Sequence, residues 1–164
     1  MREQEQARIL IIDDDESIRK TLSKALEKAG YVVDIAENGK EAIKKAQASF
    51  YNLALIDIRL PDMKGTELLT ATEETTPKMV KIILTGYPTL ENAIEAVNKG
   101  ADSYVRKPVD IEGLLREVKK QLEKQAEART YSQEKVQEFI QTRVKQLRQT
   151  RPQPGKVLEP SEDK

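Results

Sequence analysis

Acidic, hydroxyl and amino side chains follow four apolar runs of the chain, within two residues of the point where each run ends. The residues in these places are Asp13 with Asp14, then Asp57, then Thr85 and finally Lys107. Short apolar runs that alternate with helical patterns predict a parallel sheet. Ligands of such sheets bind at the carboxyl ends of the strands. We therefore expect three carboxylates, a hydroxyl and an ammonium group to meet in one pocket.

This predicted pocket suits a divalent cation and chemistry on a phosphoryl group. Asp13, Asp14 and Asp57 would repel one another unless a cation neutralised them. The chain has no histidine and no cysteine, so oxygen ligands must hold the cation, which favours Mg²⁺ or Mn²⁺. One carboxylate can act as a nucleophile and form an acyl phosphate. Lys107 offers a positive charge to the phosphoryl oxygens, and Thr85 offers a hydroxyl donor.

Helix capping is the competing explanation for these aspartates. An Asp at a strand end often caps the following helix, as Asp15 can. Capping accounts for any one of them, but it does not account for polar residues at four strand ends together with the Lys107-Pro108 dipeptide.

Composition narrows the class of protein. With 164 residues, of which 38% are hydrophobic and 34% charged, the chain has room for one buried domain and an appendage. Its formal net charge is zero, so no global field points to nucleic acid or an anionic membrane. No apolar stretch is long enough to span a membrane, and the N-terminus is too polar for a signal peptide. Absence of cysteine fits a reducing cytosol, so we expect a cytoplasmic protein without a membrane partner.

The apolar pattern predicts an α/β fold with five strand–helix units. We expect a doubly wound, five-stranded parallel sheet of order 2-1-3-4-5 with helices on both faces, and a C-terminal helical extension. Asp15 or Glu16 is expected to cap the first helix, and Asn38 with Glu41 forms a variant capping box for the second. The expected strands cover residues 7–13, 31–35, 53–57, 80–84 and 102–105, and the later helices cover 66–72, 90–98 and 111–122.

Three parts follow from this pattern: a domain at 7–122, a helical extension at 123–150 and a disordered tail at 151–164. Ser132 can cap a separate helix, or one long helix can run on from the fifth. An apolar stripe with helical spacing returns at Val136, Phe139, Ile140, Val144 and Leu147. Pairing with a partner helix, as in a homodimer, is our first interpretation of the stripe, packing back on the domain the second, and a phosphate-contacting arm the weakest.

Four stretches of the chain resemble the receiver domain of two-component response regulators over about residues 7–122. They read ILIIDDD (9–15), LIDIRLPDMKG (55–65), LTGY (84–87) and GADSYVRKP (100–108). The resemblance implies that Asp57 accepts a phosphoryl group from a histidine kinase or phosphotransfer protein. It also implies that Asp14, Asp57 and the backbone carbonyl of Arg59 ligate Mg²⁺, with Asp13 acting through water.

The same resemblance implies a switch. Thr85 and Tyr104 match the family's switch pair, Lys107 matches its invariant lysine, and the bond before Pro108 is expected to be cis. A phosphoryl group on Asp57 would draw Thr85 inward, and Tyr104 would swing from a solvent-facing position into the space behind it. The surface formed by the helix 90–98, the last strand and the helix 111–122 would then change toward a downstream protein partner.

The expected function is therefore a phosphoacceptor switch and not an enzyme. Arg59 and Tyr87, two residues after Asp57 and Thr85, would flank the path of the hydrolytic water, so we expect slow self-dephosphorylation. One alternative is a transcription regulator acting through its basic C-terminal helix, although nucleic acid is not our expected partner. An aspartyl-nucleophile phosphatase is a weaker alternative, because haloacid-dehalogenase-type enzymes carry a second Asp where this chain has Arg59.

Overall fold

The computed structural model of the chain describes residues 6–73 and 78–150, the last of these by its backbone alone. The chain divides into two compact units, one ending at Gln125 and the other beginning at Ala126. The tail at 151–164, which we expected to be disordered, lies outside the described residues. Among the described residues, no helix is long and apolar enough to cross a membrane.

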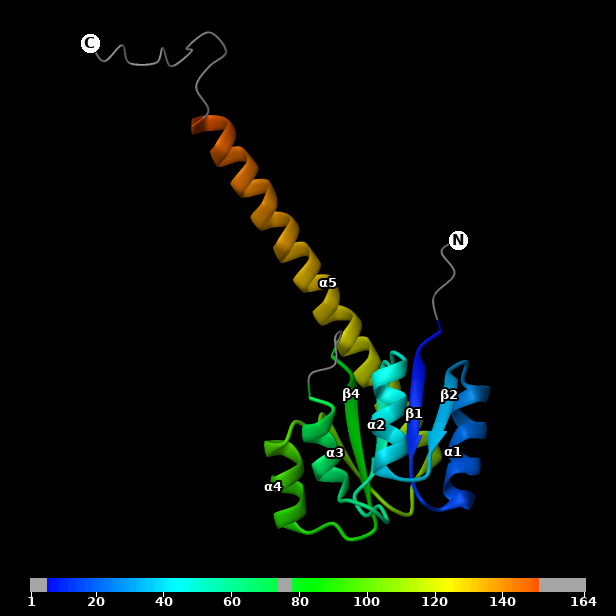
Figure 1. Ribbon diagram of the computed structural model, residues 1–164. Helices are drawn as coiled ribbons and strands as arrows, with labels where there is room; N and C mark the ends of the chain where they lie inside the picture. Colours follow the sequence, from blue (N-terminus) through cyan, green and yellow to red (C-terminus); the bar gives the residue numbers. More distant parts are fainter. Residues whose placement is uncertain (1–5, 74–77, 151–164) are drawn as a thin grey trace, which may run out of the picture. The chain divides into compact units, whose positions relative to one another are not determined.

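Five parallel strands form the sheet at the centre of the first unit (Figure 1). The strand order is β2-β1-β3-β4-β5, which confirms the order predicted from the sequence. β3 and β4, in the interior of the sheet, are buried along their whole length, as continuous apolar runs of parallel sheets are. The strands are β1 (Arg8–Ile12), β2 (Val32–Ala36), β3 (Leu53–Asp57), β4 (Val80–Thr85) and β5 (Ser103–Arg106).

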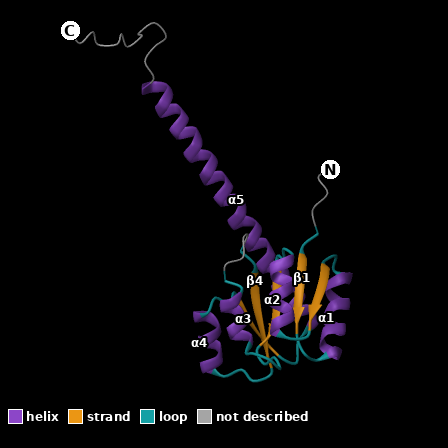
Figure 2. Cartoon of the chain, in the orientation of Figure 1, coloured by secondary structure: helices purple, strands orange, loops and turns teal. Residues whose placement is uncertain are grey.

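Helices cover both faces of this sheet (Figure 2). Their bounds are α1 (Glu16–Lys28), α2 (Gly39–Ala48), α3 (Gly65–Ala71), α4 (Leu90–Asn98) and α5 (Ile111–Thr150). Successive strand residues alternate between the two faces. Ile9, Ile11, Leu53 and Leu55 pack with α1 and the first turns of α5, whereas the residues between them pack with α2, α3 and α4. Burial of these side chains on both faces fixes the sheet, and with it the edge where the strands end.

The helix starts follow the capping residues identified in the sequence. Asp15 Oδ1 accepts hydrogen bonds from the N–H groups of Ser17 and Ile18, at 2.8 and 3.2 Å, and caps α1. Asn38 accepts from the N–H of Glu41 at 2.8 Å and caps α2. The reciprocal bond of the expected capping box is different, because Glu41 Oε2 accepts from the N–H of Glu37 instead of Asn38.

α5 is one continuous helix of 40 residues, so Ser132 does not begin a separate helix. In the first unit, Leu114 and Val118 of α5 are buried against the sheet. In the second unit, every side chain described from Ala126 to Gln149 is exposed.

Candidate functional site

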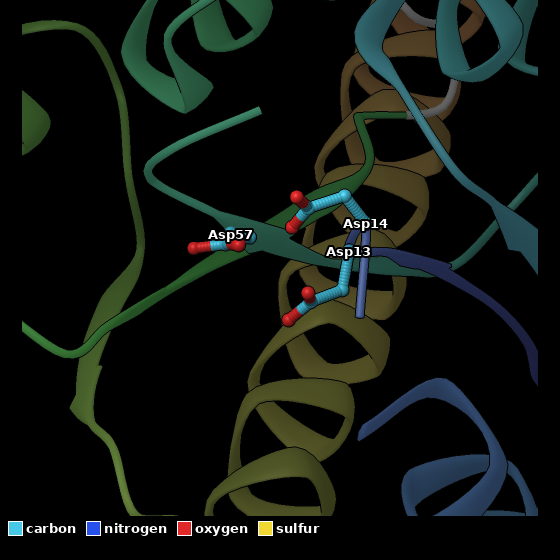
Figure 3. A group of neighbouring side chains, drawn as sticks. All are labelled: Asp13, Asp14 and Asp57. Carbon is cyan, nitrogen blue, oxygen red and sulfur yellow. The ribbon is translucent and has the colours of Figure 1, made fainter. Parts of the chain in front are cut away.

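Three carboxylates meet at the carboxyl edge of the sheet. β1 and β3 are neighbours in register, with Ile12 opposite Ile56, so Asp13 and Asp57 come next to each other one residue later. One carboxylate oxygen from each of Asp13, Asp14 and Asp57 lies within 4.8 Å of the other two. Figure 3 shows the three side chains reaching toward a common space. Asp13 and Asp57 are buried, whereas Asp14 is exposed.

An ammonium group lies against this cluster. Lys107 Nζ is 2.8 Å from Asp13 Oδ2 and 3.4 Å from Asp57 Oδ1. β5 positions it, since the N–H of Lys107 donates to the carbonyl of Thr85 at 2.7 Å. The Lys107–Pro108 peptide bond is cis. Burial lowers the pKa of Lys107, but its hydrogen bond to Asp13 and the charge of Asp57 outweigh this and leave that pKa above its ordinary value.

The cluster carries more negative charge than Lys107 balances. Burial, and then the charge of Asp13, raise the pKa of Asp57 from 3.8 to about 6, against the opposing effects of Lys107 and of the Arg59 N–H. A buried carboxylate with a raised pKa is a group that a cation stabilises in its ionised form. The available donors are carboxylate and carbonyl oxygens, which are the ligands of Mg²⁺. These residues therefore fit a hard divalent cation.

The two expected switch residues lie on adjacent strands. Thr85, at the end of β4, is fully buried, and its Oγ1 accepts a hydrogen bond from the N–H of Tyr87 at 3.0 Å. Tyr104 is half-buried against the core residues that pack with α2, α3 and α4. Its hydroxyl is buried and has no hydrogen-bond partner among the residues that the structure describes. The ring therefore lies inward. This differs from the solvent-facing position that we expected from the sequence.

Arg59 and Tyr87 stack on each other, a contact that sequence reasoning did not anticipate. The Arg59 guanidinium lies over the Tyr87 ring, 4.0 Å from its centroid. The backbone N–H of Arg59 also donates to Asp57 Oδ1 at 3.3 Å. A cation–π pair of this kind holds two loops together, the loop after β3 and the loop after β4.

Arg19 is a second residue that sequence reasoning missed. Its guanidinium donates to the backbone carbonyl of Asp13 at 2.8 Å and reaches Glu37 at 3.4 Å. The side chain is buried on α1, and it holds the main chain at the end of β1 in place. A signal was present, because Arg19 lies between Ile18 and Leu22 on the apolar side of the predicted helix.

Gly65 closes the loop that carries Arg59, and it cannot accept a side chain. Its N–H donates to the carbonyl of Ile58 at 2.8 Å. A Cβ on Gly65 would lie against the carbonyl oxygen of Asp57 and 2.9 Å from Cα of Ile58, both of which are backbone atoms. The absence of a side chain is therefore what lets this loop fold back onto the end of β3.

Gly65→Ala is expected to lower the free energy of unfolding by about 2–3 kcal/mol, because the backbone must move to relieve the overlap. Urea unfolding followed by circular dichroism measures it. Gly86→Ala is the matched control, since a Cβ at Gly86 meets nothing within 4 Å. Equal stability of the two variants would contradict this explanation of Gly65.

Comparison with known proteins identifies the family. Residues 9–119 match the family model described as the response regulator receiver domain, and the chain belongs to this family. This confirms the resemblance and the fold expected from the sequence.

Individual relatives support the same assignment. The chain is 36% identical over 115 residues to the uncharacterized transcriptional regulatory protein YkoG of Bacillus subtilis (strain 168), a match covering 70% of this chain and 50% of that protein. It thus spans about half the length of this curated relative. A CheY-like receiver domain from Methanospirillum hungatei JF-1 has 46% identity and a TM-score of 0.73, over 75% of this chain and 98% of that one.

One solved relative carries the modification that the site suggests. It is a response regulator from Burkholderia pseudomallei with a phosphorylated aspartic acid, a calcium ion and citrate. The likeness has 35% identity and a TM-score of 0.64, and covers 67% of this chain and 65% of that one.

Proposed function

We propose that Asp57 accepts a phosphoryl group from a histidine kinase or phosphotransfer protein, and that the domain at about residues 7–122 works as a switch. The observation that carries this proposal is the position of Lys107 Nζ, 2.8 Å from Asp13 and 3.4 Å from Asp57. This ammonium group is placed to bind the oxygens of a phosphoryl group on Asp57. The phosphorylated aspartic acid of the Burkholderia relative supports the same chemistry here.

The transfer requires an ionised Asp57. A carboxylate oxygen of Asp57 attacks phosphorus as the bond from phosphorus to the donor nitrogen breaks, and the freed imidazole takes a proton from water. Asp14 and Asp57, with the backbone carbonyl of Arg59, would hold Mg²⁺, and Asp13 would act on it through water. The ion would supply positive charge toward the phosphoryl oxygens. Lys107 and the Thr85 hydroxyl supply the remaining contacts.

The switch begins at Thr85. Its Oγ1 accepts from the N–H of Tyr87, so turning the hydroxyl toward a phosphoryl group on Asp57 gives up or shifts this bond. Tyr104 already lies inward, so the proposed switch does not require its ring to move in from solvent. The proposed output surface is α4, β5 and the first turns of α5, whose contacts with a downstream partner would change.

The output itself has two candidates. The first is contact with a protein in the cytoplasm. The second is control of transcription, which the name of YkoG, a transcriptional regulatory protein, favours. Our expectation that nucleic acid is not a partner therefore has no support from the relatives. Gel-shift assays with a salt titration on the full chain distinguish the two.

The experiment that tests the phosphoacceptor role is intact mass spectrometry. The chain is incubated with a small-molecule phosphodonor, with Mg²⁺ or with a chelator. We expect one added phosphoryl group with Mg²⁺, none in Asp57→Asn, and an unchanged result in Asp110→Asn, which removes an exposed carboxylate elsewhere. Full labelling of Asp57→Asn would disprove the assignment of Asp57.

Arg59 and Tyr87 are expected to slow loss of the phosphoryl group. Their side chains stack, with the guanidinium 4.0 Å from the ring centroid, and the Arg59 N–H donates to Asp57. Neither side chain provides a carboxylate or an amide to orient water. Arg59→Asn with Tyr87→Glu is expected to speed decay of the phospho-protein about tenfold or more. Decay is followed by intact mass after removal of the donor, and decay slower than in the wild type would count against this role.

A further inference from the structure

The outer face of α4 is apolar and exposed. Leu90, Ile94 and Val97 are 77%, 50% and 65% exposed, and their spacing of four and three residues puts them on one side of the helix. An open hollow of ≈ 420 Å³ lies on this helix, lined by Glu91, Ile94, Glu95, Asn98 and Lys99. We call these residues, with Leu90 and Val97, the α4 face. An exposed apolar patch with a polar rim is typical of a protein-binding surface.

The second unit carries an apolar stripe of its own. Its members are between 42% and 70% exposed, and most follow one another at intervals of four or three residues. They are Val136, Phe139, Ile140, Val144 and Leu147, which we call the tail stripe. From Val136 to Leu147 the stripe runs about 16 Å along the helix, at 1.5 Å per residue. Leu90 to Val97 runs about 10 Å, so the tail stripe is long enough to cover the α4 face.

The charges around the two apolar surfaces are complementary. The charged residues of α4 are Glu91 and Glu95, of which Glu95 pairs with Lys99 at 3.1 Å. Between Val136 and Gln149 the helix carries three basic side chains, Arg143, Lys145 and Arg148, against one acidic side chain, Glu138. Opposite charges at the rim of an apolar contact steer association and fix its register.

We propose that the tail stripe of one copy of this chain binds the α4 face of a second copy. The exchange is mutual, because two reciprocal contacts close a two-fold dimer, whereas a single one builds an open chain. This proposal identifies a second copy as the partner of the surface formed by α4, β5 and α5, and in that respect it rests on the proposed function. The contact itself forms without a phosphoryl group. Parallel pairing of two tail stripes is less favourable than this exchange, because Arg143 of one copy would lie close to Arg143 of the other.

The test measures the mass of the full chain by sedimentation and light scattering, over a range of concentrations, in the unphosphorylated Asp57→Asn background. We expect twice the 18.6 kDa of one chain. Glu91→Lys with Asn98→Lys is expected to weaken the dimer about tenfold or more, because like charges then face each other. Lys145→Glu with Arg148→Glu is expected to do the same, and combining all four changes to restore the dimer. Glu27→Lys, an exposed change on α1, is the control and leaves the dimer intact.

Three outcomes overturn the proposal. The first is a monomer at every concentration, and the second is a combination of the four changes that does not restore the dimer. The third is a dimer that the α4 changes leave intact but that Phe139→Gln with Ile140→Gln abolishes, since this shows that the tail stripes pair with each other. Because the background lacks the Asp57 carboxylate, none of these outcomes depends on phosphoryl transfer, which the intact-mass experiment tests separately.

Discussion

Lys107→Met is expected to lower the initial rate of phosphoryl incorporation from a small-molecule donor by about 10²–10³-fold. Lys107 Nζ lies 3.4 Å from the Asp57 oxygen and 2.8 Å from Asp13, where it can neutralise charge that develops on the phosphoryl oxygens. Methionine keeps most of the side-chain volume and removes the charge. The rate is measured by intact mass at short times with saturating Mg²⁺.

The control for Lys107→Met is Lys24→Met, which removes an exposed charge on α1 and should leave the rate unchanged. Circular dichroism spectra of both variants establish that each is folded. A folded Lys107→Met chain that is labelled as fast as the wild type would contradict the role of this ammonium group.

Asp57→Asn is expected to stabilise the chain near neutral pH when no metal is bound. Burial and the charge of Asp13 raise the pKa of Asp57 from 3.8 to about 6. The folded chain therefore binds more protons than the unfolded chain between these two values, so the wild type loses stability as the pH rises through this window. Above pH 6 the ionised Asp57 costs about 3 kcal/mol, and the variant does not have this cost.

Thermal melts in chelator between pH 4 and pH 8 measure the difference between Asp57→Asn and the wild type. The variant should melt at nearly the same temperature as the wild type near pH 4, increasingly above it between pH 4 and about 6, and by a constant margin at higher pH. Mg²⁺ should raise the melting temperature of the wild type more than that of the variant, because binding to the folded state alone is stabilising. A variant that melts below the wild type at pH 7 in chelator would show that Asp57 is not under electrostatic strain.

The sequence was sufficient to predict the sheet and most of its helices. β3 begins and ends at the predicted residues, Leu53 and Asp57, and α4 covers the predicted Leu90 to Asn98. These elements are short, and each is bounded by a polar or turn-forming residue, which is where local pattern is most informative. The pocket followed from strand order alone, because the ends of neighbouring parallel strands must come together.

Contacts across loops could not be predicted from local pattern. Arg59 and Tyr87 are far apart along the chain and stack only once two loops meet. Tyr104 was expected to face solvent, but its hydroxyl is buried, a choice of side-chain position that depends on packing from α2, α3 and α4. The sequence left open, for another reason, whether α5 ends near Leu122 or continues. The apolar density falls after Leu122, yet residues 123–135 are rich in good helix formers, and the helix continues through them.

A crystal structure of the chain grown with Mn²⁺ in place of Mg²⁺ tests the metal site most directly, because anomalous scattering identifies the ion. We expect a single ion bound by carboxylate oxygens of both Asp14 and Asp57, with Lys107 close by and not ligating it. An ion bound elsewhere, or no ion while these two carboxyl groups turn away from each other, would contradict the proposed phosphoacceptor site.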